Sequence, residues 1–336
     1  MPIFIKIYMA ELYISLQEPR YWRNSWIEAA RRLGVEVVDN LSTPSVLPLT
    51  NMSAAKLALQ NDINFMSADT HDILIDCYNR QLHLPAVPAA QSYEEVQRLD
   101  MPVYVKPRAN LGKGTHPLAH SRWASGVALC NSKHWRDFVD ADPQLNGLVV
   151  CPDLGTPMSC LDVDISINSF SEVYVINCYS YGFISYKRPF DILHPTETIP
   201  TSLVAKVQEF CYSNNIRGGI YNIQVVEYNE QWCIMDWNIR PSSICSIIAQ
   251  VPGVVDKGLA HMLSLPLPEH ANKYLEVRSY WDPPIAGENL NKITSAGLFH
   301  NSVWNDGPNI RRVIGVGHDR DEVEYKFNIL NKSITN

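Results

Sequence analysis

The stretch from residue 219 to residue 241 constrains the fold of this chain more than any other. Two runs of aromatic and branched residues flank a short polar break, Tyr228 to Gln231, which is typical of a β-hairpin. Because strand side chains alternate between the two faces, Asp236, Asn238 and Arg240 are expected on the same face of the second strand. The pattern therefore predicts a polar row on a strand that otherwise has a buried composition.

The length of the hairpin loop decides which residue lies opposite this row. With a three-residue loop, Asn229 to Gln231, the pairing places Gln224 directly opposite Asp236. Oxygen donors gathered in this way suit a hard cation such as Mg²⁺, which prefers oxygen ligands and keeps room for water and phosphate oxygens. Alternating polar residues are also typical of a half-solvated antiparallel strand, so the pattern alone leaves both interpretations open.

Composition bounds the class of protein. The 336 residues are 46% hydrophobic, enough for a substantial core and for two or three compact modules. The formal charge is −7, only 19% of the residues are charged, and no basic run occurs, so a nucleic-acid partner would lack its electrostatic footprint. We therefore expect a globular protein that does not bind nucleic acid as its main partner.

The cysteines and the N-terminus indicate where the protein resides. The eight cysteines show no C-x-x-C spacing and lie mostly in apolar runs, as expected of reduced, buried thiols. The apolar run from Ile3 to Tyr8 is short for a signal peptide, and no window reaches about 18 apolar residues. A cytoplasmic protein without a membrane partner is the expectation.

The hairpin resembles the metal-binding end of the ATP-grasp ligases, in which an acidic residue and one further residue precede Asn-x-Arg-Pro. Asn222-Ile223-Gln224 is most similar to the carbamoyl-phosphate synthetase branch, where Gln replaces the usual first acidic ligand. The resemblance implies Mg²⁺, with Mn²⁺ as the alternative ion, on Gln224, Asp236 and Asn238. It also implies that Arg240 holds an acylphosphate or a tetrahedral oxyanion, because a planar guanidinium binds two oxygens at once.

A second resemblance lies at the strand 102–107 and the loop that follows it. Val-x-Lys-Pro, ending in Lys106 and Pro107, is similar to the ATP-grasp strand that contacts the α and β phosphates. Gly112 and Gly114 would let the backbone approach phosphate oxygens, and Lys113 would contact the γ phosphate. A strand closed by Lys-Pro and a plain glycine turn is the alternative.

A third resemblance lies at the strand 145–150, which corresponds to the adenine hinge of the family. Val150 and Cys151 would offer backbone groups to the base. Met158 stands where the family has an acidic residue, so we take Asp153 as the substitute for the ribose contact.

Two further pairs of residues are candidates for substrate binding. Lys187 and Arg188 end a tyrosine-rich strand-like stretch and would neutralise a carboxylate or phosphate, or else protect an exposed edge from aggregation. Ser242 and Ser243 follow Asn-x-Arg-Pro and would line the acceptor pocket, or else cap the next helix.

Alternating strand and helix signals precede these motifs. They include a strand at 3–8, a helix over 22–33 and a strand at 35–38, which together predict a parallel sheet. The fold class expected is α/β and α+β, an ATP-grasp architecture with an N-terminal doubly wound α/β domain. The predicted divisions are the N-terminal domain 1–88, a small ATP-grasp subdomain 89–150, a large subdomain 151–273 with the metal-binding hairpin, and a C-terminal strand and helix module 274–336.

The resemblance implies an ATP- and Mg²⁺-dependent carboxylate–amine ligase that forms ADP. A carboxylate would attack the γ phosphate, and an amine would capture the acylphosphate. The segment 69–72 lacks the Lys or Arg found in many relatives and offers only His71, which favours a catalytically reduced ATP-binding or partner-binding module as an alternative. A small-molecule kinase is the third interpretation. The partners expected are small-molecule carboxylate and amine substrates, and a homodimer is an option that the sequence leaves open.

Overall fold

The structure is a computed structural model. It describes residues 10–40, 45–50, 90, 92–98, 103–107, 128–130, 148–152, 160–181, 192–195, 199–214, 216–228, 230–238, 240–269, 273–280, 285–300 and 312–335. The strands are β1 (Glu11–Tyr13), β2 (Glu36–Val38), β3 (Val103–Pro107), β4 (Ala128–Cys130), β5 (Leu148–Pro152), β6 (Cys160–Ile167), β7 (Val173–Tyr181), β8 (Ile192–Pro195), β9 (Gly219–Tyr228), β10 (Gln231–Asn238), β11 (Tyr274–Ser279), β12 (Phe299–His300) and β13 (Arg312–Gly317). The helices are α1 (Arg20–Arg32), α4 (Tyr93–Val96), α6 (Thr201–Ser213), α7 (Ser243–Ile248), α8 (Asp256–Met262), the short 3₁₀ turn η1 (Gly287–Asn289), α9 (Leu290–Ser295) and α10 (Arg320–Thr335).

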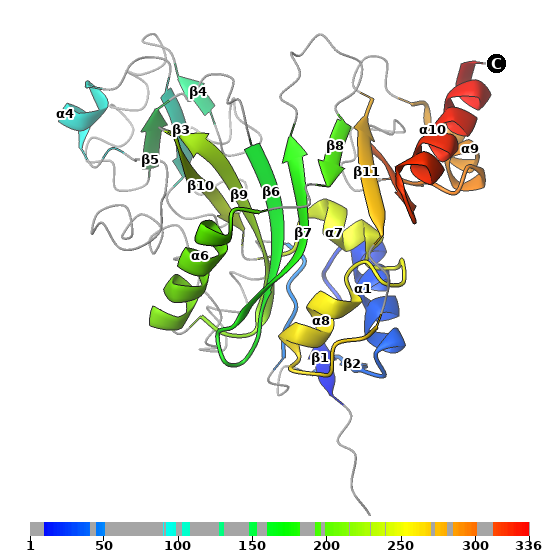
Figure 1. Cartoon of the computed structure of the whole chain (residues 1–336), viewed down its shortest axis with the longest axis horizontal. Helices are drawn as coiled ribbons and strands as arrows, with labels where there is room; N and C mark the ends of the chain where they lie inside the picture. The colour runs from blue at the N-terminus through cyan, green and yellow to red at the C-terminus, as the bar shows by residue number, and fades with distance from the viewer. Residues whose placement is uncertain are drawn as a thin grey trace, which may run out of the picture.

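The described strands form three sheets. The largest has eight antiparallel strands in the order β10-β9-β6-β7-β8-β11-β13-β12, so the last strands of the chain extend the sheet that carries the hairpin. A three-stranded antiparallel sheet has the order β4-β3-β5, and β1 pairs with β2 in parallel. Figure 1 shows the three-stranded sheet at one end of the molecule and helices α9 and α10 at the other.

One face of the large sheet is apolar because alternate residues of its strands are branched or aromatic. Leu161, Val163 and Ile165 of β6 lie in one buried cluster with Val207 and Phe210 of α6. Helix α6 begins directly after Pro200 and packs its apolar side chains into this cluster. This face is therefore closed by α6, and polar side chains of the same strands have to lie on the other face.

The N-terminal helix α1 packs with α7 and α8 in a second buried cluster. The predicted helix over 22–33 is confirmed by α1, whose Trp26 donates an indole N–H to Ser246 Oγ of α7 at 3.2 Å. At the end of α1, the Arg32 guanidinium meets the fully buried Asp256 carboxylate, with Nε 3.1 Å from Oδ2. The first part of the chain is thus fixed to the segment that follows the hairpin.

The C-terminal strands and helices have their own buried cluster between β13 and helices α9 and α10. Gly315 of β13 allows this close packing, because a Cβ there would lie 2.6 Å from Val323 Cγ1 and 2.8 Å from Phe327 Cε2. The predicted terminal helix is confirmed by α10. The domain divisions proposed from sequence remain predictions.

Two further expectations concern the N-terminal region and the membrane. The strand predicted at 3–8 lies outside the described residues, and the structure shows β1 a little later in the chain. No helix within the described ranges combines the length and apolar character needed to cross a bilayer.

Candidate functional site

The hairpin β9–β10 pairs Gln224 with Asp236, which confirms the predicted register. The predicted three-residue loop was wrong, because Tyr228 already pairs with Gln231 and leaves two residues between the strands. Glu230 in this turn has a φ of 61°, in the left-handed region that two-residue hairpin turns use. An irregularity between Ile234 and Asp236 then corrects the register, because it leaves one residue without a partner.

This β-bulge decides to which face of the sheet the Asp236 position belongs. Ile234 and Trp237 pair with Val225 and Ile223, and all four side chains belong to the cluster beneath α6. Residues that pair directly across two strands share a face, so the Gln224–Asp236 pair lies on the face opposite α6. A regular strand after a two-residue turn would instead pair Asp236 with Ile223, facing the apolar core.

Strand β6 adds two aspartates to this polar face that the sequence analysis did not single out. Asp162 pairs with Gln224, and Asp164 pairs with Asn222, which in turn pairs with Asn238. Two rows of polar residues therefore cross β6, β9 and β10. One row is Asp162, Gln224 and Asp236, and the other is Asp164, Asn222 and Asn238. The signal in the sequence was the alternation Asp-Val-Asp inside an apolar run, which is also the pattern of an ordinary half-exposed strand.

Three side chains of this polar face are buried and linked by hydrogen bonds. Asn238 Nδ2 donates to Asn222 Oδ1 at 3.2 Å, and Asn222 Nδ2 donates to Asp162 Oδ1. Asp162, Asn222 and Asn238 are each at most 7% exposed. The Asn238 amide thus directs its nitrogen at Asn222 and its oxygen away from Asn222.

Asp164 fixes the chain where it leaves β10. Its two carboxylate oxygens accept hydrogen bonds from the backbone N–H and the hydroxyl of Ser242, each at 2.8 Å. Ser242 Oγ in turn accepts from Cys245 N at 2.9 Å and caps helix α7. Of the two roles considered for Ser242, the helix cap is the one observed, while substrate contacts by Ser242 and by Ser243, the first residue of α7, remain predictions.

Burial dominates the electrostatics of this face. Burial, and then the nearby charge of Asp162, raises the pKa of Asp164 to about 7, against the opposing effects of the Ser242 hydrogen bonds and the Arg240 charge. Burial also raises the pKa of Tyr179 well above its ordinary value, with the Asp164 charge as the next cause. The Tyr179 hydroxyl is buried and has no hydrogen-bond partner within the described part of the chain. Burial thus favours the neutral, protonated forms of Asp164 and Tyr179 on this face.

Arg240 lies at the edge of this cluster. It is partly exposed, its Nη1 donates to the Pro241 carbonyl at 2.8 Å, and its charge acts on Asp164. The predicted catalytic arginine therefore lies two residues before the residue that Asp164 holds.

The structure describes only some of the other residues that were predicted to contact the nucleotide or substrate. Lys106 pairs with Val149 between β3 and β5, and for Lys106 and Asp236 the structure describes the backbone alone. The Val150 carbonyl accepts a hydrogen bond from Ala90 N at 2.8 Å, and Cys151 pairs with Tyr104. The predicted residues Gly112, Lys113, Gly114, Asp153, Lys187 and Arg188 lie outside the described residues.

The donor set fits a hard cation better than a soft one. Among the described residues, no three His, Cys, Asp or Glu side chains gather in a group that would hold a metal ion. The ligands predicted at the hairpin, one carboxylate and two amide oxygens, suit Mg²⁺ and would leave positions for water and phosphate oxygens.

The architecture is that of the ATP-grasp enzymes, which confirms the fold class. Three solved structures of this kind are similar over almost the whole chain. N5-carboxyaminoimidazole ribonucleotide synthetase from Thermus thermophilus is 11% identical with a TM-score of 0.64, covering 98% of this chain and 99% of that one. The synthase from Aspergillus clavatus, in complex with ADP and 5-aminoimidazole ribonucleotide, is 12% identical with a TM-score of 0.61, covering 98% and 99%.

The third similar structure is a biotin carboxylase complex with an ATP analogue from Campylobacter jejuni. It is 11% identical with a TM-score of 0.60, covering 96% of this chain and 91% of that one. No family model matches the sequence, and no curated protein matches it. At these identities the similarity establishes the fold, and the activity has to be argued from the residues of this chain.

Proposed function

We propose that this protein is an ATP- and Mg²⁺-dependent ligase that activates a carboxylate as an acylphosphate and joins it to an amine. The observation that supports this most is the pairing of Gln224 with Asp236 on the face opposite α6, next to the pair Asn222 and Asn238. This pairing gathers oxygen donors near the end of an ATP-grasp fold. The names of similar structures, which include complexes with ADP and with an ATP analogue, agree with a nucleotide site.

The proposed reaction has two steps. A carboxylate oxygen attacks the γ phosphorus, the bond to the β–γ bridging oxygen breaks, and ADP leaves with that electron pair. The amine nitrogen then attacks the carbonyl carbon, loses a proton, and inorganic phosphate departs. Such transfers depend on positioning and charge neutralisation more than on a strong base.

Each residue of the proposed site has a role in this chemistry. Gln224, Asp236 and Asn238 would hold Mg²⁺, which when bound neutralises phosphate charge. Lys106 would contact the α and β phosphates, and Arg240 would bind the oxygens of the acylphosphate. Asp164 would orient the Arg240 segment through its two hydrogen bonds to Ser242.

ADP release from the full chain tests this function. The assay would supply ATP and Mg²⁺ with pairs drawn from amino acids, small carboxylates, bicarbonate and simple amines. We expect ADP release that requires both an acid and Mg²⁺, and a coupled product seen by mass spectrometry. Asp236→Asn should lower kcat by about 100-fold or more and raise the Mg²⁺ concentration needed, because a charged ligand is lost.

Glu227→Gln is the matched control, since it removes one carboxylate from an exposed position on the same hairpin. It should leave both kcat and the Mg²⁺ requirement unchanged. An Asp236→Asn protein with the wild-type Mg²⁺ requirement would contradict the metal site. Tight ATP binding without turnover under every mixture would instead indicate a binding module, and a stable phosphorylated substrate would indicate a kinase.

A further inference from the structure

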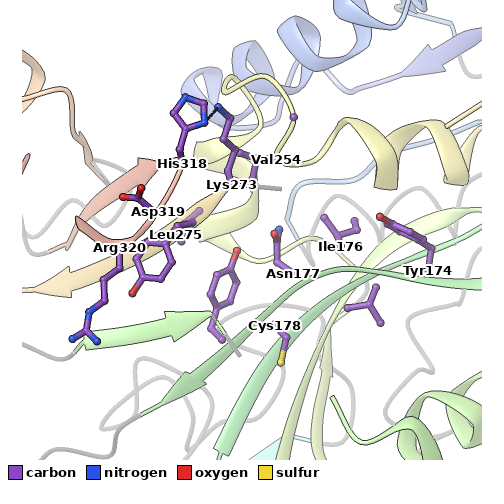
Figure 2. Close-up of a pocket in the computed structure, with 14 residues that line it drawn as sticks. Tyr174, Ile176, Asn177, Cys178, Val254, Lys273, Leu275, His318, Asp319 and Arg320 are labelled. Atoms are coloured by element: carbon purple, nitrogen blue, oxygen red, sulfur yellow. Dashed lines mark hydrogen bonds between the residues drawn. The ribbon is translucent and has the colours of Figure 1, made fainter. Parts of the chain in front are cut away.

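A cavity of about 810 Å³ opens beside strand β7, and its described lining includes none of the described residues predicted to bind ATP or metal. One wall is formed by β7 from Tyr174 to Tyr179, and the facing wall by residues 273–275 and 318–320 (Figure 2). Cavities that hold small molecules usually measure about 300–1,000 Å³. The size alone therefore suits a metabolite.

Strand β8 pairs with only short parts of its two neighbours in the sheet. It pairs with β7 only at residues 179–181 and with β11 only at Val277 and Arg278. Earlier in β7 and in β11, toward Tyr174 and Tyr274, the described residues include no strand between the two. The strand edges of β7 and β11 border this gap, and strand edges carry backbone groups able to bind a polar ligand.

The wall opposite β7 carries two cations, Lys273 and Arg320, and one carboxylate, Asp319. Lys273 and Arg320 line the cavity and form no ion pair with any described residue, and Lys273 Nζ lies 3.5 Å from His318 Nδ1. Asp319 Oδ1 accepts a hydrogen bond from Glu322 N at 2.9 Å, and the Glu322 carboxylate meets Lys326. Arg320 is also the first residue of α10, whose N-terminus adds partial positive charge.

The β7 wall supplies hydrogen-bonding groups of a different kind. Asn177 lines the cavity, and its Nδ2 has a long contact of 3.9 Å with Cys245 Sγ, so a ligand could make stronger hydrogen bonds with its amide. Tyr174 lines the same wall and stacks obliquely on His261, with ring centroids 5.5 Å apart. Figure 2 shows Tyr174 and Asn177 on one side and Lys273, His318 and Arg320 on the other.

We propose that this cavity is a binding site for a small organic anion, with the negative group at Lys273 and Arg320 and the polar body against Asn177. A carboxylate and a phosphate monoester share this chemistry. Both are attracted by two cations that have no acidic partner among the described residues and by the helix N-terminus beside them. The proposal does not depend on the ligase activity.

Isothermal titration calorimetry on the full chain tests the site with two probes, citrate for the carboxylates and glycerol 3-phosphate for the phosphate monoesters. We expect at least one of them to bind the wild-type protein. The double variant Lys273→Ala/Arg320→Ala should weaken that binding by about tenfold or more, since each cation contributes a charge-assisted contact. Comparison of the probes distinguishes the two kinds of anion.

The double variant Lys206→Ala/Arg217→Ala is the matched control, because it removes the same charge from two exposed positions that do not line the cavity. It should leave the dissociation constant within about twofold of the wild-type value. Equal weakening in both double variants, or no binding of either probe to the wild-type chain, overturns the proposal. Lys106→Ala separates the nucleotide region, and weakening by this variant alone would place the anion there and also refute the cavity site.

Discussion

Asp164 is a carboxylate that this fold keeps fully buried beside a second carboxylate, Asp162. Buried charges without a cationic partner in contact are costly, and burial here raises the pKa of Asp164 to about 7. The hydrogen bonds to Ser242 offset only part of that cost. A residue of this kind is more readily explained by the segment it holds, which contains the proposed catalytic Arg240, than by a gain in stability.

The pH dependence of unfolding should reveal this residue. Between the ordinary pKa of 3.8 and about 7, the unfolded chain has released the proton that folded Asp164 still holds. The free energy of unfolding contributed by this group therefore falls as the pH rises through that window, and levels off above it. Asp164→Asn removes the titration, so the variant should gain stability relative to wild type from pH 5 to pH 8 in urea unfolding.

Asp321→Asn supplies the comparison for this measurement, because it makes the same substitution at an exposed position in the first turn of α10. Its stability difference from wild type should stay flat with pH. If the curves for wild type and Asp164→Asn run parallel, Asp164 does not titrate in that window.

At the scale of single elements, the junction of β10 and α7 is set by one residue. Ser242 ends the strand segment with an extended backbone, caps α7 through Cys245 N, and donates its hydroxyl to Asp164. The register of β10 depends on an equally local feature, the β-bulge that brings position 236 into pairing with Gln224. The β-bulge thus positions the proposed metal ligand Asp236 relative to β6, and Ser242 positions the segment that contains the proposed catalytic Arg240.

Ser242→Ala should destabilise the protein by about 1–3 kcal/mol, because it removes a helix cap and leaves a buried carboxylate oxygen without its hydroxyl donor. Ser243→Ala, one position later and inside the helix, should cost less than about 0.5 kcal/mol, as substitutions away from such contacts do. Chemical denaturation of the two variants compares them directly. Equal losses would mean that the cap and its bond to Asp164 contribute little.

At the scale of the whole molecule, the N-terminal part is joined to the region after the hairpin by a buried ion pair. The Arg32 guanidinium also donates to the carbonyls of Ala249 and Gln250 at 2.7 and 3.0 Å, while Asp256 accepts from Gly253 N at 3.0 Å. These contacts connect α1 with the loop between α7 and α8.

Arg32→Ala should reduce the free energy of unfolding by about 3–5 kcal/mol, because the fully buried Asp256 carboxylate would lose its cation. Arg31→Ala is the neighbouring control, since that side chain is 75% exposed and pairs only with Glu28 one turn earlier among the described residues. The control should change stability by less than about 0.5 kcal/mol. Similar urea midpoints for the two variants would show that the buried pair does not hold the two regions together.

Local patterns in the sequence determined much of this protein. The helices α1, α6 and α10 and the strands of the hairpin follow from periodicity and turn residues, which are short-range properties. The pairing of Gln224 with Asp236 was also predicted, although through a loop one residue too long. That agreement arose because the β-bulge adds the residue that the shorter turn lacks.

Tertiary structure alone decided how the polar residues come together. Asp162 and Asp164 lie about 60 residues or more before their partners Asn222 and Ser242, and no local pattern distinguishes them from the solvated face of an ordinary strand. The position of β11 and β13 in the same sheet, and the cavity lined by β7 and the start of β11, likewise depend on pairing between distant segments. Sequence patterns fix which residues form a strand, whereas the neighbours of that strand depend on how the whole chain buries its apolar surface.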